Sequence, residues 1–181
     1  MNSPVVTGRV MQREALAEGL LAYRCGESGG IYIPADSYWR WLSRSTERLP
    51  QLPMPSEEVP KEESSGRTLV CPESGMLMTR YRVGHGFGFA IDRSPSGGIW
   101  LDAGEWEALR NRQFHDELHL VFTAPWQREI RRLEWVEAEK LRYEERLGAA
   151  LVSRIDALRR ELAEHPDREM ALALINRPLG D

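Results

Sequence analysis

Hydrophobic and polar residues alternate in two short stretches in the middle of the chain, Leu77–Val83 and Phe87–Asp92. Alternation of this kind is typical of a strand with one buried face, and the Gly-His-Gly between the stretches is typical of a hairpin turn. An apolar triplet, Ile99–Leu101, follows a Gly-Gly turn, and an acidic helix start comes next at Asp102 and Glu105. We therefore expect a β-hairpin, a third strand and a short helix here.

The same layout occurs 68 residues upstream. The motif Ser-Gly-Gly-Ile at Ser28–Ile31 is repeated at Ser96–Ile99. At the same offset the residues that follow are also similar: Tyr32 aligns with Trp100, Ile33 with Leu101, Ala35 with Ala103 and Tyr38 with Trp106. Upstream of the motif, Cys25 aligns with Arg93 and Ser3 with Cys71. Identity and matched aromatic residues at one fixed offset indicate an internal repeat. We predict two copies of one small module, with a strand at Ile31–Ile33 and a helix capped by Asp36 in the first copy.

Apolar residues recur at helical spacing in the last third of the chain. Thr123 is suited to cap a helix, Pro125 to its first turn, and Trp126 to His165 contains no proline. We expect one helix of about 40 residues and about 60 Å. Its expected stripe is Ile130, Leu133, Val136 or Glu137, Leu141, Leu147, Leu151, Ile155, Leu158 and Leu162. The module before it is expected to end in a helix that continues through Phe122, and Asp167–Asn176 is expected to form a short terminal helix.

The composition defines the chain's organisation. The segment 45–67 holds four prolines and many acidic residues, which predicts an extended, flexible linker. The resulting α+β prediction has a module at 1–44, a linker at 45–67, a second module with its helix at 68–122, and a long helix plus a short helix at 123–181. A net charge of −4 argues against a chain built mainly to bind nucleic acid, and no apolar run is long enough to span a membrane.

The two cysteines are too few for a disulfide scaffold, so we expect free thiols in a cytoplasmic protein. The N-terminus lacks the basic and then apolar pattern of a signal peptide. If the protein is exported after all, a Cys25–Cys71 disulfide is the alternative to test.

Residues 71–109 contain Cys-Pro, a Gly-Gly pair and "WLDAGE" in an order that resembles the TFIIB-like zinc-ribbon family of small bacterial proteins. Residues 3–42 resemble the family more weakly, through "YRCGESGGIYI". The resemblance covers about half of the chain and leaves the C-terminal helices aside. It implies a zinc-ribbon fold with two cysteine knuckles in each module and a role in nucleic-acid binding or transcription.

Most of the family's cysteine ligands are replaced by serine in this chain. The knuckle scaffold comprises Cys25, Ser28, Gly29, Gly30, Cys71, Ser74, Ser94, Ser96, Gly97 and Gly98. A serine hydroxyl is a poor zinc ligand at neutral pH, and one thiolate per module is too few for structural zinc. We therefore expect metal-free modules stabilised by packing of their aromatic residues. A composite zinc site from Cys25, Cys71 and histidines is the alternative.

Two further groups of residues suggest other chemistry. His115 and His119 are spaced to lie one turn apart on a helix, which is compatible with metal binding, although the pattern is not the metalloprotease motif. Arg80 and Arg82 flank Tyr81 in the predicted hairpin, which is compatible with binding single-stranded nucleic acid. We find no nucleophile–base pair, phosphate loop or dinucleotide motif, so we do not expect an enzyme.

The function that we expect is that of a non-catalytic adaptor, which binds a protein partner or a second copy through its long helix. Exposed aromatic and apolar residues are the candidate contacts: Trp39, Trp41, Trp135, Leu147, Leu151, Leu158 and Leu162. The alternative is a zinc-binding, transcription-associated protein that binds nucleic acid through Arg80 and Arg82.

Overall fold

The computed structural model describes residues 1–44, 52–53 and 67–178, so the predicted linker lies almost wholly outside the described residues. The chain divides into two compact units, Met1–Ile130 and Arg131–Asp181. We call the first unit the head and the second the tail, and each is described by itself. The boundary falls inside a helix, eight residues after the expected end of the second module at residue 122.

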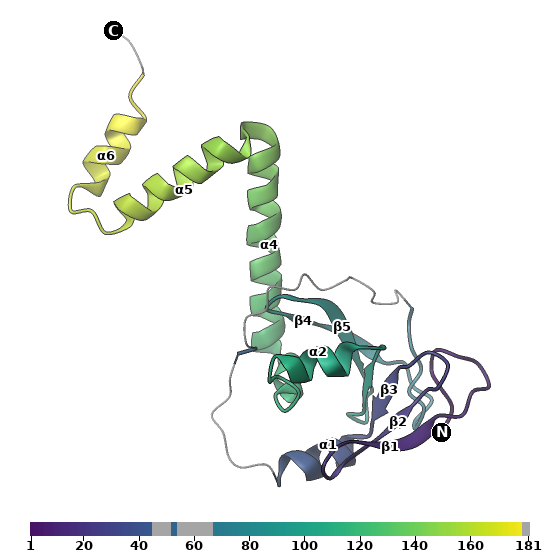
Figure 1. Ribbon diagram of the computed structural model, residues 1–181. Helices are drawn as coiled ribbons and strands as arrows, with labels where there is room; N and C mark the ends of the chain where they lie inside the picture. The colour runs from purple at the N-terminus through teal and green to yellow at the C-terminus, as the bar shows by residue number, and fades with distance from the viewer. Residues whose placement is uncertain (45–51, 54–66, 179–181) are drawn as a thin grey trace. The chain divides into compact units, whose positions relative to one another are not determined.

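The described residues of the head form one six-stranded antiparallel sheet rather than two separate ones, which makes the fold α+β (Figure 1). In spatial order the strands are β1 (Gln12–Ala17), β2 (Leu20–Arg24), β3 (Ile31–Ile33), β6 (Ile99–Leu101), β5 (Phe87–Arg93) and β4 (Thr79–Gly84). The predicted strand triplets and the hairpin are confirmed. Strand β4 begins at Thr79, two residues later than expected, because Leu77 forms only an isolated bridge with Val70.

The two modules meet at the pairing of β3 with β6 in the middle of the sheet. Tyr32 lies opposite Trp100, and Ile31 and Ile33 lie opposite Leu101 and Ile99. These are the residues that the 68-residue repeat makes equivalent, so exchanging the two modules leaves the pairing unchanged. The repeat is therefore built as a local two-fold arrangement in which each module completes the sheet of the other.

The repeated glycines make room for the opposite module. A Cβ atom added to Gly30 would meet the indole ring of Trp100, and one added to Gly98 would meet the phenol ring of Tyr32. The preceding glycines behave in the same way, with Gly29 facing Ala103 and Gly97 facing Ala35. Both of these preceding glycines also have positive φ angles, at +72° and +92°, a conformation that favours glycine.

Alternation along β3 and β6 separates the buried side chains of the described head into two clusters. Ile31, Ile33, Ile99 and Leu101 face the larger cluster, while Tyr32 and Trp100 face the smaller one. Helices α1 (Ala35–Leu42), α2 (Glu105–Asn111) and α3 (Leu118–Val121) supply further side chains to the larger cluster: Tyr38, Trp41, Trp106, Leu109, Leu118 and Val121. The smaller cluster contains both cysteines.

The helix boundaries in the head differ from the expected ones. Helix α1 begins at Ala35 with Pro34 as its N-cap, so Asp36 lies in the first turn and instead pairs with Arg40 at 2.9 Å. Helix α2 ends at Asn111 rather than continuing through Phe122. The cause is local, because Gln113 adopts a left-handed φ of 51°, which a continuing helix does not permit.

The expected single helix from Trp126 to His165 is wrong. Helix α4 (Ala124–Leu147) and helix α5 (Ala149–Ala163) are separated by Gly148, whose φ of 82° and ψ of 140° lie far from helical values. Thr123 precedes α4 as expected, and its Oγ1 accepts a hydrogen bond from the Trp126 N–H at 3.4 Å. The short terminal helix α6 (Arg168–Ile175) follows Asp167, whose side chain makes no capping hydrogen bond.

None of the helices in the described part of the chain combines the length and the apolar character needed to cross a membrane.

Candidate functional site

The first thiol lies in a tight backbone loop. The Cys25 N–H donates to the Gly30 carbonyl at 2.8 Å, and the Gly29 N–H donates to the Cys25 carbonyl, also at 2.8 Å. The thiol is buried and free. Burial opposes its ionisation, but hydrogen bonds from the side chains of Ser28 and Ser3 and from nearby backbone N–H groups outweigh burial and lower the pKa of Cys25 to about 7.

The second thiol lies in a loop of the same kind, at the start of the second module. The Gly75 N–H donates to the Cys71 carbonyl at 2.9 Å, and the Ser74 N–H lies 3.5 Å from the Cys71 sulfur. Burial again opposes ionisation, and hydrogen bonds from Ser74 and Tyr32 lower the pKa of Cys71 to about 7.

Tyr32 links the first module to this second thiol. Its hydroxyl lies 2.7 Å from a carboxylate oxygen of Glu73 and 3.4 Å from the Cys71 sulfur, so its one proton is within reach of the carboxylate and of the thiolate that forms when Cys71 ionises. Burial, together with Cys71 and Glu73, raises the pKa of Tyr32, which keeps the hydroxyl protonated at neutral pH. An aromatic side chain of one module thus reaches the knuckle of the other.

Ser94 occupies the position that corresponds to Cys25. Cys25 comes two positions after Tyr23, which pairs with Tyr32 in the sheet. Ser94 likewise comes two positions after Asp92, which pairs with Trp100. The expected match of Cys25 with Arg93 is therefore wrong by one position, because the loop of the second module is one residue shorter. The Ser94 hydroxyl accepts from the Gly98 N–H at 2.9 Å and lies 2.8 Å from the Ser96 hydroxyl.

The donor set of the knuckles does not fit structural zinc. Each module offers a single thiol, and the hydroxyls of Ser3, Ser28, Ser74 and Ser94 take part in hydrogen bonds within their loops. Across the described residues, no cluster of three or more histidine, cysteine or carboxylate side chains is placed to hold a metal ion. In each loop the serine hydroxyls instead accept hydrogen bonds from backbone N–H groups of the same loop.

The two histidines do not share a helix face, so that prediction is wrong. Helix α3 begins only at Leu118, and His115 lies in the preceding turn. The His115 ring packs 5.7 Å from the Trp41 ring and 5.5 Å from the Trp106 ring, measured between centroids. His119 lies instead beside Trp39, with ring centroids 5.6 Å apart. The aromatic rings of α1 and α2 thus surround the histidines.

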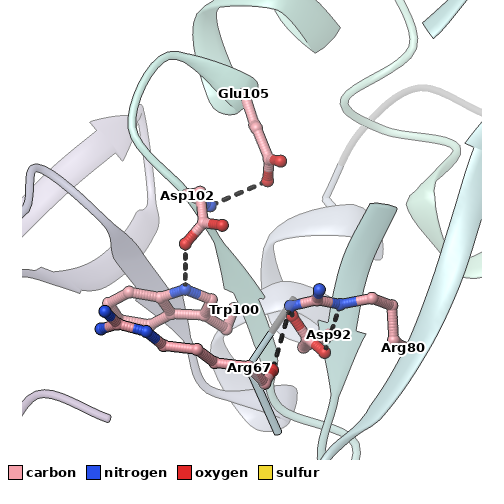
Figure 2. A network of polar contacts seen from close by, with 6 residues as sticks. All are labelled: Arg67, Arg80, Asp92, Trp100, Asp102 and Glu105. Atoms are coloured by element: carbon pink, nitrogen blue, oxygen red, sulfur yellow. Dashed lines mark hydrogen bonds and ion pairs between the residues drawn. The ribbon is translucent and has the colours of Figure 1, made fainter. Parts of the chain in front are cut away.

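Arg80 belongs to a buried polar network, which Figure 2 shows. Its guanidinium donates two hydrogen bonds to Asp92, at 3.2 and 2.9 Å, and Asp92 is almost completely buried. Burial raises the pKa of Asp92, and the hydrogen bonds from Arg80 oppose that rise. The Arg80 guanidinium is therefore paired with a buried carboxylate. Arg82 is exposed, and its carbonyl accepts from the Gln127 amide at 2.8 Å.

The same network continues to the start of α2. The Trp100 indole N–H donates to Asp102 at 2.8 Å, and the Asp102 backbone N–H donates to Glu105 Oε2 at 2.8 Å (Figure 2). The other oxygen, Oε1, has no hydrogen-bond donor among the described residues. Burial, with help from Asp102 and Asp92, raises the pKa of Glu105 to about 8. Sequence reasoning missed this network, although a lone aspartate in an apolar strand, opposite an arginine, was a signal for it.

The tryptophan candidates of the head differ in exposure. Trp39 is 48% exposed, whereas Trp41 is only 9% exposed and packs in the larger cluster. The expectation that Trp41 forms part of an exposed surface is therefore wrong. Two successive positions on a helix are about 100° apart, so residues 39 and 41 point to nearly opposite sides of α1.

The apolar side chains of the tail are largely exposed. On α4, Leu133, Val136, Leu141 and Leu147 are 38 to 51% exposed, and Trp135 is 59% exposed. On α5, Leu151, Ile155 and Leu158 are 39 to 43% exposed, and Leu162 is partly exposed. An open groove of about 430 Å³ follows α5, lined by Leu151, Arg154, Ile155, Ala157, Leu158 and Glu161. The tail thus carries the largest concentration of exposed apolar candidates in the described chain.

No family model matches the chain, and the searches of curated proteins and of solved structures also returned no match. The resemblance to zinc ribbons therefore rests on the motifs of the two modules alone and stays a prediction.

Proposed function

We propose that the protein is a non-catalytic adaptor whose tail docks onto a protein partner. The observation that carries this proposal is the row of exposed apolar residues on α4, Leu133, Val136, Leu141 and Leu147. The intervals between these residues are three, five and six positions, and at 100° per residue their directions fall within about 140° of the helix circumference, which places them on one side of α4. An apolar row of this kind costs solvation free energy until another surface covers it.

The charges of the helices support a protein partner over nucleic acid. Between Trp126 and His165 the chain has nine basic and nine acidic side chains, so the helices have no strong positive potential that would attract phosphates. In the head, the pairing of Arg80 with Asp92 occupies one of the two arginines on which the nucleic-acid alternative depends. The two free thiols support a location in the cytoplasm, where thiols stay reduced.

A photo-crosslinking amino acid placed in α4 tests the proposal. We expect a crosslinker at position 141, inside the apolar row, to capture a discrete protein in the native cell. A crosslinker at position 142 is the matched control, because Arg142 is also exposed but lies about 100° or more around the helix from every residue of the apolar row. We expect the control to capture that protein much less efficiently.

A second variant links the capture to the apolar row. Leu147→Glu introduces a charge into the apolar row six residues, or about 1.7 turns, beyond position 141 and should abolish the crosslink, whereas Arg142→Gln should leave it unchanged. Equal capture from positions 141 and 142, or capture that survives Leu147→Glu, would contradict the proposal.

A further inference from the structure

The groove along α5 has an apolar centre and a charged residue of opposite sign toward each end. Leu151, Ile155 and Leu158 form the centre, with Arg154 near the start of the groove and Glu161 near its end. Both charged side chains are exposed. A surface with this distribution of charge is complementary to itself when it is turned end over end.

The apolar spacing of α5 fits an antiparallel helix pair. Leu151, Ile155, Leu158 and Leu162 follow one another at intervals of four, three and four residues, which is the spacing of a coiled-coil seam. If two copies cross midway between Asp156 and Ala157, Ile155 of each copy faces Leu158 of the other. Leu151 then faces Leu162, so that all four apolar layers are filled.

The charged residues beside the seam select this orientation. In the antiparallel pair, Arg154 of each copy lies beside Glu161 of the other, which gives two equivalent ion pairs. In a parallel pair in register, Arg154 would instead lie beside Arg159 of the other copy, and two like-charged contacts would result. The antiparallel pairing is therefore favoured by attraction and the parallel one is opposed by repulsion.

From this complementarity we propose that α5 docks against α5 of a second copy of the chain, in antiparallel orientation. The inference rests on the proposed function as a protein-binding tail, and it names a second copy as the occupant of the α5 groove, while the α4 row is left for the partner. Two helices of 15 residues bury on the order of 800 Å² in total, which is small for a specific interface. The dimer is accordingly expected to be weak and to depend on concentration.

Sedimentation equilibrium of the full chain across about 1 to 500 μM measures the association directly. We expect a concentration-dependent dimer for the native chain. Arg154→Glu and Glu161→Arg each replace two attractions by two repulsions, so each variant should weaken its own dimer at least about tenfold. Arg160→Glu is the matched control, since Arg160 lies on the outer side of α5, and should leave the association unchanged.

Mixing the two charge variants distinguishes the proposed orientation from any other. A chain with Arg154→Glu carries two acids at the groove, and a chain with Glu161→Arg carries two bases, so their mixture should form a heterodimer about as stable as the native dimer. The doubly substituted chain, Arg154→Glu with Glu161→Arg, should also recover association. Circular dichroism of each variant confirms that its helices form.

Three outcomes would overturn the inference. These are a monomer at every concentration, a dimer that is indifferent to the single charge reversals, and reversals whose effect is not relieved by mixing. The crosslink from position 141 is independent of these measurements. Loss of the dimer with an intact crosslink would refute only the self-pairing, and a dimer without the crosslink would refute only the partner-binding function.

Discussion

Replacing Gly30 with alanine tests the packing at the junction of the two modules. The added Cβ would meet three atoms of the Trp100 indole ring, the farthest of them at 3.0 Å. Trp100 is only 1% exposed and is held by the hydrogen bond from its indole N–H to Asp102, so the ring cannot move aside freely. Overpacking of this kind costs about 1 to 3 kcal/mol. We expect the upper end of that range, because the obstacle is a rigid ring.

Urea denaturation followed by tryptophan fluorescence measures this cost. A loss of about 3 kcal/mol should lower the midpoint without changing the slope, and should lower the melting temperature by roughly 10 °C. Gly26→Ala is the matched control in the same loop, because an added Cβ there meets nothing within 4 Å and Gly26 has no positive φ. We expect the control to change the unfolding free energy by less than about 0.5 kcal/mol.

Because the two modules are related by a local two-fold arrangement, the equivalent glycine of the second module, Gly98, can be tested in the same way. A Cβ added to Gly98 meets the Tyr32 ring and its hydroxyl, so Gly98→Ala should destabilise the head in the same way. In a Tyr32→Phe background the hydroxyl is gone, and the cost of Gly98→Ala should fall measurably. If Gly30→Ala proved as stable as Gly26→Ala, the proposed packing of Trp100 over Gly30, and with it the register of β3 against β6, would be refuted.

Three further changes test other parts of the structure. Glu105 has a pKa of about 8 in the head and 4.5 as a model compound, so its proton stabilises the fold at low pH and this contribution is lost as the pH rises through 8. Glu105→Gln should therefore flatten the fall in unfolding free energy between pH 5 and 8. An unchanged slope would contradict the argument that burial raises this pKa. Tyr32→Phe should raise the pKa of Cys71 from about 7. Thiolate absorbance in a Cys25→Ser background measures this pKa. A Cys71 pKa that stays at about 7 would show that Tyr32 does not stabilise the thiolate. Gly148→Ala should convert the break between α4 and α5 into helix and raise the helical circular dichroism signal. The reason is that glycine costs about 1 kcal/mol in a helix, while alanine is strained at a φ of 82°. An unchanged signal would show that tertiary contacts impose the break.

Local patterns in the sequence were sufficient to locate β3, β4, β5 and β6, whereas β1 and β2 were not located. The Gly-His-Gly turn predicted the hairpin of β4 and β5, and the Gly-Gly turns located the starts of β3 and β6. Such patterns do not encode which strands pair across a long separation. The merging of both modules into one sheet through β3 and β6 therefore became evident only in the structure, although the repeat had identified the equivalent residues.

The errors in the helices have local causes that one sequence does not resolve. A lone glycine in a helical pattern is compatible with continuation or with a break, and Gly148 breaks the helix. Gln113 has a positive φ, which prevents α2 from continuing beyond this point. Glutamine rarely adopts such a φ, so the residue type did not indicate that the helix would end here. The separation of Trp39 from Trp41, by contrast, follows from helix geometry and was predictable.

The candidate sites were predicted unevenly for a related reason. The loops around Cys25 and Cys71 were recognisable from their cysteine and glycine spacing. The network of Arg80, Asp92 and Glu105 depends on contacts between three elements, which residue spacing along the chain does not report. From the sequence, Arg80 was therefore interpreted as part of an exposed basic cluster and Glu105 as an acid at a helix start, and neither was expected to be part of a buried network.

The pairing of β3 with β6 also has a consequence for how the two modules have diverged. Each Gly-Gly pair accommodates side chains of the opposite module, so a substitution in one copy damages the core of the other. At the knuckle positions the contact between the modules is a hydrogen bond rather than close packing, as between the Tyr32 hydroxyl and the Cys71 sulfur. A hydroxyl can take the place of a thiol in such a hydrogen bond, whereas a side chain at Gly30 or Gly98 would displace an aromatic ring of the opposite module, and the two copies accordingly share Ser-Gly-Gly-Ile but not their cysteines.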